Sequence, residues 1–177
     1  MRLVIQRVSR AEVRVDGVSV GRIGTGLLVL VGLERGDTAE QVERAAGRVA
    51  SLRVFEDADG KMNRGLKEVG GEVLAVSQFT LAGSMRRGRR PSFDGAMSGE
   101  DAEPMFERFV EALRACEVRV ETGVFGAMME VELVNDGPVT LLWEDPPERS
   151  DSGHCLGCLN VEAMGKPMTA PRAGCRL

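Results

Sequence analysis

The sequence predicts an α+β fold, a mixed-sheet α/β arrangement with a barrel-like sheet at its core and two main helices. About seven or eight strand-like segments accompany the two helices, and several follow one another directly instead of alternating with helices. Neither a dinucleotide-binding glycine motif nor a phosphate-binding P-loop follows any of these strands, so a doubly wound nucleotide-binding fold is excluded. A chain of 177 residues, 43% of them hydrophobic, suffices for one domain with a sizeable core.

The first half of the chain supplies four strands and a helix. A strand over residues 3–8 is followed by alternating valines on both sides of Asp16-Gly17, a two-residue signal of a β-hairpin. The uninterrupted apolar run 27–31 predicts a strand that is covered on both faces. Thr38 and Gln41 then fit a capping box, which predicts the start of a helix with apolar residues at helical spacing.

The second half supplies the other helix and the remaining strands. Pro104 is placed near the start of this second helix, because proline is favoured in the first helical turn. Apolar and acidic residues alternate over residues 129–133, which predicts a strand with one buried and one solvated face. A turn over residues 135–138 follows. The strands expected in this half span residues 73–76, 118–120, 129–133 and 139–143.

The charge balance is mildly acidic, with 23 basic and 27 acidic residues. It excludes a nucleic-acid binder that acts through bulk positive charge, but it permits a local basic patch. No apolar run approaches the roughly 20 residues of a membrane helix. Charges at Arg2 and Arg7 also come too early for the apolar centre of a signal peptide. We therefore expect a soluble, cytoplasmic protein with no membrane partner.

The composition changes near residue 144, which predicts a domain over residues 1–144 and a Pro- and Gly-rich extension over 145–177. The extension holds four side chains that can ligate a tetrahedral zinc ion: His154, Cys155, Cys158 and Cys175. Adjacent His and Cys rarely ligate one ion together. We therefore expect a flexible, reduced tail without metal, with a zinc site and a redox motif as the alternatives. Cys116, in the domain, is interpreted as a structural thiol.

Three segments carry polar residues that core packing does not require. Residues 77–80 follow the second buried strand, where a loop exposes side chains and amides; a capped strand end is the alternative. Residues 85–91 hold four arginines suited to phosphate, unless they form a solvated loop paired with carboxylates. Residues 135–140 contain a Gly-Pro bond that can be cis at a low intrinsic cost, with an ordinary turn as the alternative.

Together with two further motifs, these segments resemble the D-aminoacyl-tRNA deacylase family. The match follows the same order and spacing over residues 1–143 and leaves the extension outside. It rests on Gln6-Arg7-Val8, Phe55-Glu56-Asp57 with Gly60-Lys61-Met62-Asn63, Ser77-Gln78-Phe79-Thr80-Leu81, Gly88-Arg89-Arg90-Pro91-Ser92-Phe93 and Asn135-Asp136-Gly137-Pro138-Val139-Thr140.

The resemblance implies a homodimeric hydrolase that cleaves D-aminoacyl-tRNA, and tRNA mischarged with glycine, at the ester bond to the terminal adenosine. Gly137-Pro138 would be a cis motif that reaches into the partner's pocket and rejects L-aminoacyl esters, and Arg7 would hold it in place. The pocket for adenosine and ester would be lined by Ser77, Gln78, Phe79 and Thr80, with Phe125 and Met129 as walls. Phosphates of the tRNA would be contacted by Arg86, Arg87, Arg89 and Arg90.

The chemistry expected in this pocket needs no cofactor. The domain has no histidine, which excludes Ser-His-Asp and Cys-His catalysis there, and no base is found to activate Thr80 as a nucleophile. The residues favour the alternative held for the family, in which the substrate's own 2′-hydroxyl assists and the N–H groups around Phe79 and Thr80 stabilise the oxyanion. Three other functions remain open: a relaxed-chirality deacylase with a trans Gly137-Pro138 bond, a non-catalytic tRNA-binding module, and a zinc hydrolase that uses the extension.

Overall fold

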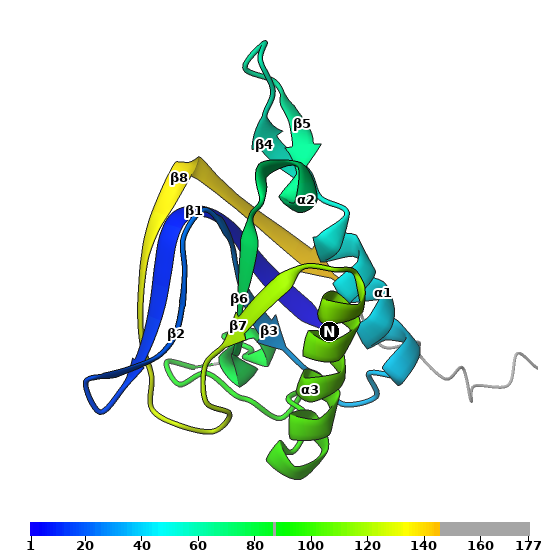
Figure 1. Ribbon diagram of the computed structural model, residues 1–177. Helices are drawn as coiled ribbons and strands as arrows, with labels where there is room; N and C mark the ends of the chain where they lie inside the picture. The colour runs from blue at the N-terminus through cyan, green and yellow to red at the C-terminus, as the bar shows by residue number, and fades with distance from the viewer. Residues whose placement is uncertain (87, 146–177) are drawn as a thin grey trace, which may run out of the picture.

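The computed structural model describes residues 1–86 and 88–145, and its centre is a curved, mixed sheet of six strands (Figure 1). The strand order is β2-β1-β3-β6-β7. Outside this order, β8 pairs antiparallel with β1 from Arg2 to Arg14. The strands are β1 (Arg2–Val15), β2 (Val18–Ile23), β3 (Gly26–Gly32), β6 (Glu72–Ser77), β7 (Arg119–Thr122) and β8 (Glu130–Glu144). The predicted α+β class with a barrel-like sheet and two main helices is confirmed.

The two strands predicted from apolar runs form the middle of the sheet. β3 and β6 pair in parallel, and helices α1 (Ala39–Ala50) and α3 (Gly99–Ala115) cover one face (Figure 1). Val49 of α1 and Phe109 of α3 are fully buried against this face. A second, smaller core on the opposite face contains Val8, Ala11, Val13, Ile23, Leu28, Leu74 and Val76. No helix of the described residues is long and apolar enough to cross a membrane.

The two helices differ in how well their starts were predicted. At α1 the capping box is present: Gln41 N–H donates to Thr38 Oγ1 (3.4 Å), and Thr38 N–H donates to Gln41 Oε1 (2.9 Å). At α3 the prediction was wrong, because Pro104 lies inside the helix and the start is five residues earlier. The cap there is Ser98, whose Oγ accepts from Asp101 N–H (3.4 Å). A Ser-x-x-Asp cap is thus a better marker of this start than proline.

Four predicted strands merge into two long ones. Residues 3–8 and the first arm of the hairpin form β1, while β8 includes the segments on both sides of residues 135–138. The pairing of β1 with β8 moves from Gln6 opposite Thr140 to Val8 opposite Asn135. Residues 136–139 therefore form a bulge opposite Arg7, because β1 continues past them as a common partner.

A short hairpin at one end of the sheet was not predicted. β4 (Arg53–Glu56) and β5 (Met62–Gly65) pair antiparallel and project from the body, followed by the one-turn helix α2 (Leu66–Val69) (Figure 1). These strands have four residues each and no run of alternating apolar positions, so the usual sequence signal is absent.

The face predicted to be buried over residues 129–133 is only partly covered. Met129 and Leu133 are half-buried, and Val131 is 36% exposed. On the same strand, Leu142 is 77% exposed. Alternation identifies which side chains share a face, but it does not show that the chain itself covers that face.

Candidate active site

A cavity of about 610 Å³ lies where β6 ends. The chain turns there into a single 3₁₀ turn, η1 (Phe79–Ala82), which places consecutive polar residues beside an otherwise apolar space. The cavity brings together six of the predicted site residues: Ser77, Gln78, Phe79, Thr80, Phe125 and Met129.

Backbone hydrogen bonds fix the chain at this position. Gln78 N–H donates to Val31 O of β3 (2.7 Å), which extends the parallel ladder by one residue before η1 begins. Leu81 N–H then donates to Gln78 O (3.2 Å) as the first bond of the turn. The N–H groups of Phe79 and Thr80 precede this bond, so the turn itself supplies them with no acceptor. Both residues line the cavity.

The hydroxyl of Thr80 has an amide as its neighbour. Gln78 Nε2 donates to Thr80 Oγ1 (2.6 Å), so the oxygen accepts and its own proton is left for another acceptor. An amide N–H cannot remove a proton. Among the described residues, no carboxylate or amine forms a hydrogen bond with this hydroxyl. The geometry orients Thr80 but does not activate it as a nucleophile.

Sequence reasoning missed much of the apolar lining. Val31 was interpreted only as a core strand residue and Leu33 was not singled out, and nothing in an apolar run distinguishes a core position from a cavity wall. The start of α3 contributes small residues, including Gly99 and Ala102, which leave room for a ligand. The Ser98 cap was the available signal for this part of the cavity.

Gly137 and Pro138 lie in the bulge of β8, and neither is among the described residues that line the cavity. Their peptide bond is cis, the geometry that the resemblance implied. Arg7, only 4% exposed, holds the bulge to the β4–β5 hairpin. Its Nε donates to Asp136 O (3.0 Å), and its Nη1 donates to Val54 O of β4 (2.6 Å). The Asp136 carboxylate lies 3.3 Å from the same Nε.

Asn135 also holds the bulge, a role that the sequence analysis did not assign to it although it belongs to the predicted segment 135–140. Its Oδ1 accepts from Val139 N–H (2.8 Å), and its Nδ2 donates to Val139 O (3.2 Å), so one side chain spans the four-residue segment. Gly137 has a φ of 129°, which L side chains rarely adopt. A Cβ there would lie 2.8 Å from Val139 Cγ2 and 3.0 Å from Arg7 Nη2. The bulge is held by these side-chain contacts, and its φ and close packing favour glycine at this position.

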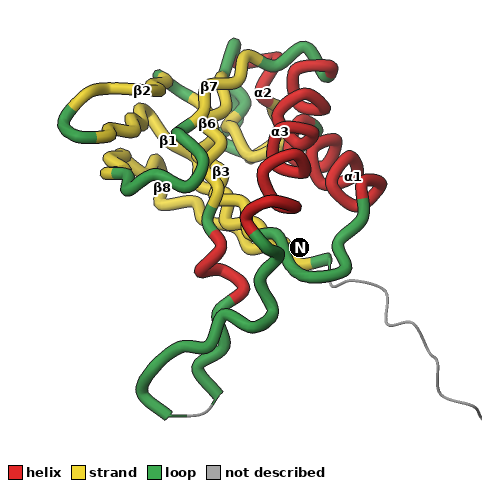
Figure 2. The backbone as a smooth tube through the Cα atoms, turned by 90° about the horizontal axis from the view of Figure 1, so that it is seen from below, coloured by secondary structure: helices red, strands yellow, loops and turns green. Residues whose placement is uncertain are grey.

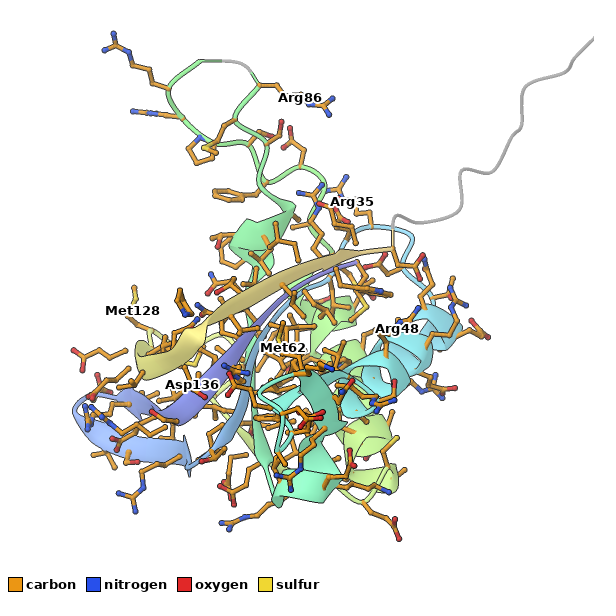
Figure 3. The ribbon with its side chains drawn as sticks, turned by 90° about the horizontal axis from the view of Figure 1, so that it is seen from above. Arg35, Arg48, Met62, Arg86, Met128 and Asp136 are labelled. Carbon is orange, nitrogen blue, oxygen red and sulfur yellow. The ribbon has the colours of Figure 1, made fainter. Side chains whose placement is uncertain are left out.

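Residues 83–86 and 88–94 belong to a segment that projects from the body beyond η1 (Figure 2). Ser84 and Ser92 close its neck through two backbone hydrogen bonds (2.7 and 2.9 Å). Beyond the neck are Arg86, Arg89 and Arg90, all exposed, and Arg86 extends from the projecting loop into solvent (Figure 3). Arg87 lies outside the described residues. We call residues 85–91 the arginine loop.

The described arginines of the arginine loop have no carboxylate partner. Within residues 1–86 and 88–145, Arg86, Arg89 and Arg90 form no ion pair, a property that they share with some arginines of the body, Arg48 among them. The alternative of a loop neutralised by its own carboxylates therefore finds no support in these contacts.

The structure contains no metal-binding group of His, Cys, Asp and Glu within its described part. Cys116 is a free, half-buried thiol at the end of α3. The candidate zinc ligands His154, Cys155, Cys158 and Cys175 lie outside the described residues.

Comparisons with known proteins agree with this architecture. The chain matches the family model described as D-Tyr-tRNA(Tyr) deacylase over residues 4–144. It is 61% identical over 142 residues to a D-aminoacyl-tRNA deacylase of Symbiobacterium thermophilum, which covers 80% of this chain and 94% of the relative. It is 57% identical over 150 residues to a protein of the same name from Paracoccus denitrificans, which covers 85% of this chain and 100% of the relative.

Two solved structures share the fold. The c-Myc DNA unwinding element binding protein matches with a TM-score of 0.77 at 41% identity, over 82% of this chain and 99% of that chain. A probable eukaryotic D-amino acid tRNA deacylase matches with a TM-score of 0.68 at 21% identity, over 80% of this chain and 97% of that chain. The second likeness concerns the fold alone.

Proposed function

Because the chain belongs to the D-Tyr-tRNA(Tyr) deacylase family, we propose that it hydrolyses the ester between a D-amino acid and the terminal adenosine of tRNA. It is a hydrolase of ester bonds. The observation that carries the proposal for this chain is the cavity at the end of β6, where Phe79 and the hydrogen-bonded pair of Gln78 and Thr80 line an otherwise apolar space. Release of free tRNA would occur in the cytoplasm, where translation takes place.

The direct test is deacylation of three substrates by the purified chain. We expect hydrolysis of D-aminoacyl-tRNA and glycyl-tRNA, with L-aminoacyl-tRNA left intact. Binding of tRNA without hydrolysis would favour a non-catalytic module. Cleavage of L-esters would favour the relaxed-chirality alternative, and loss of activity with a chelator would favour the zinc hydrolase.

Catalysis in this proposal depends on positioning. The N–H groups of Phe79 and Thr80 stabilise the oxyanion, a contribution often worth about 3 kcal/mol. The 2′-hydroxyl of the terminal ribose assists the attack of water on the ester carbonyl, since the substrate itself holds this hydroxyl next to the ester. The amide contact that orients Thr80 without activating it supports this division of roles.

Chiral selection is assigned to the Gly137-Pro138 bulge of a second subunit. An enzyme that ignores the amino-acid side chain must recognise the α-ammonium and Cα, and rigid main-chain groups suit this task. The contacts of Arg7 and Asn135 support such rigidity. Glycine has no side chain to exclude, so its removal from tRNA follows from the same steric filter.

A homodimer is proposed because an apolar row on the sheet is only partly covered: Leu142 is exposed, and Val4 and Leu30 are half-buried. Leu142 pairs with Val4, and Val4 pairs with Leu30, so three apolar side chains lie side by side across β8, β1 and β3. They lie on the face opposite the helices, because Leu3 and Ile5 face the helical core and side chains alternate along a strand. The row continues to Val76, which pairs with Leu30 and lines the cavity. A second copy on this face would reach the cavity.

The first prediction concerns Thr80→Ala. We expect kcat/KM for D-aminoacyl-tRNA to fall by less than about tenfold, because the hydroxyl lacks a base and the N–H groups remain. Single-turnover hydrolysis measures this, with Thr80→Ser as the matched control. A loss beyond about a thousandfold, with folding and tRNA binding intact, would show that Thr80 is the nucleophile. A substrate whose terminal ribose lacks the 2′-hydroxyl should instead react far more slowly.

The second prediction concerns salt. If each described arginine of the arginine loop contacts one phosphate, the logarithm of affinity falls with the logarithm of salt concentration with a slope of about −2 to −3. Arg89→Ala is expected to make this slope less negative by about one. Arg48→Ala is the matched control, since Arg48 is exposed on α1, away from the loop (Figure 3). Titrations of labelled tRNA at several salt concentrations measure the slope, and equal slopes for all three proteins would remove this role.

A further inference from the structure

Two exposed aromatic side chains touch each other next to the cavity. Of the six phenylalanines and one tryptophan in the chain, only Phe79 and Phe93 are exposed, by 58% and 36%. Their ring centroids are 5.3 Å apart, and the planes meet at 68°, an edge-to-face contact. Since every other aromatic residue is at least half-buried, this pair is a distinctive feature of the surface.

The pair lies between the cavity and the arginine loop. Phe79 lines the cavity. Phe93 directly follows Ser92, whose hydrogen bonds with Ser84 close the neck of the loop. The order outward from the cavity is thus Phe79, Phe93, the neck and then the unpaired arginines. An RNA strand whose 3′ end occupies the cavity and whose phosphates meet the loop must pass these two rings.

The ring of Phe93 is held in place by the backbone next to it. A Cβ at Gly83 would lie 2.9 Å from Phe93 Cε1 and 2.8 Å from Thr80 O, so the absence of a side chain at residue 83 is what lets the ring approach. A ring fixed on one side and open to solvent on the other loses little freedom when a planar group stacks on it. This is the property of an aromatic platform for unpaired bases.

We propose that Phe93, together with Phe79, forms a stacking site for the base of the nucleotide next to the terminal adenosine. The inference rests on the proposed function for the direction of the strand, but it assigns a separate subsite. Stacking is tolerant of sequence, because every base has a π-face, so the site accepts the unpaired 3′ segment of any tRNA. Phe93 acts in binding, and the reacting ester lies beyond its reach.

The kinetic test compares a long and a short substrate. Phe93→Leu keeps an apolar side chain but removes the aromatic face, and Phe93→Tyr keeps the face. We expect Phe93→Leu to raise KM for D-aminoacyl-tRNA about tenfold with little change in kcat. Hydrolysis of D-aminoacyl-adenosine, which has no neighbouring nucleotide, should be unchanged, and Phe93→Tyr should resemble the wild type. Equal losses on both substrates, or no loss on either, would overturn the proposal.

A binding measurement separates this inference from the proposed activity. An uncharged acceptor-stem hairpin that carries 2-aminopurine next to its terminal adenosine reports stacking through loss of fluorescence. We expect stronger quenching in complex with the wild type and Phe93→Tyr than with Phe93→Leu. If the wild type hydrolyses neither ester but this difference is present, the proposed activity fails and the stacking site stands. If D-esters are hydrolysed and quenching is the same in all three proteins, the stacking site is wrong.

Discussion

Replacing Gly137 by alanine is expected to lower kcat/KM for D-aminoacyl-tRNA by at least about a hundredfold, the scale of loss when a positioning group moves by about 1 Å. The new Cβ would lie 2.8 Å from Val139 Cγ2 and 3.0 Å from Arg7 Nη2, and the φ of 129° is one that alanine avoids. Arg7 and the bulge cannot both keep their positions. The proposed chiral filter is displaced, while the two cores of the subunit are untouched.

The control for Gly137→Ala is Gly17→Ala. Gly17 also has a positive φ, of 78°, but a Cβ at this residue would meet no atom within 4 Å apart from its chain neighbours. Gly17→Ala therefore strains the backbone in the β1–β2 turn without affecting the bulge. Single-turnover assays on D-aminoacyl-, glycyl- and L-aminoacyl-tRNA, with thermal melts of each variant, measure the effect. Full activity and unchanged selectivity in Gly137→Ala would show that the bulge takes no part in the reaction.

The elements that the sequence predicted well are those with strong local signals. The apolar runs 27–31 and 73–76 became the paired central strands, and the Thr38–Gln41 capping box begins α1 as expected. In each case the residues that specify the element are neighbours in sequence. The start of α3 was misplaced because the prediction rested on Pro104, which lies inside the helix, and did not use the Ser98 cap, although both signals were local.

What the sequence missed depends on contacts between distant segments. The β4–β5 hairpin consists of two short, mostly polar strands, and its base is held by Arg7, about 47 residues away in the chain. The merging of residues 129–144 into one strand depends on β1 as a common partner. Patterns within a segment contain no information about either contact.

For the site, the residues around η1 could be anticipated and the apolar walls could not. Ser77 to Thr80 are polar residues at the exit of a buried strand, an unusual place that invites a functional interpretation. Val31 and Met97 are hydrophobic residues in hydrophobic surroundings, so only their positions in space reveal that they line a cavity. The same holds for Phe93, whose exposure no local pattern predicts.

Replacing Leu142 by arginine is expected to convert the proposed dimer to monomers and to abolish most of its activity. Leu142 is 77% exposed in the single subunit, so a charge there costs the isolated fold little. In a dimer that covers the row of Leu142, Val4 and Leu30, two-fold symmetry would bury the new charge twice. Burying unpaired charges is costly enough to prevent association. Without a partner, no Gly137-Pro138 bulge would reach the cavity.

A matched control is Val18→Arg, since Val18 is 65% exposed on β2 and lies outside the row. Light scattering after size exclusion measures the mass of each variant, and deacylation is assayed at the same protein concentrations. We expect Leu142→Arg to have the mass of one subunit, the melting behaviour of a folded domain and a loss of activity of more than about a hundredfold. Val18→Arg should remain dimeric and active. A folded Leu142→Arg monomer with full activity and unchanged selectivity would show that each subunit holds a complete site, and the bulge would then need another role.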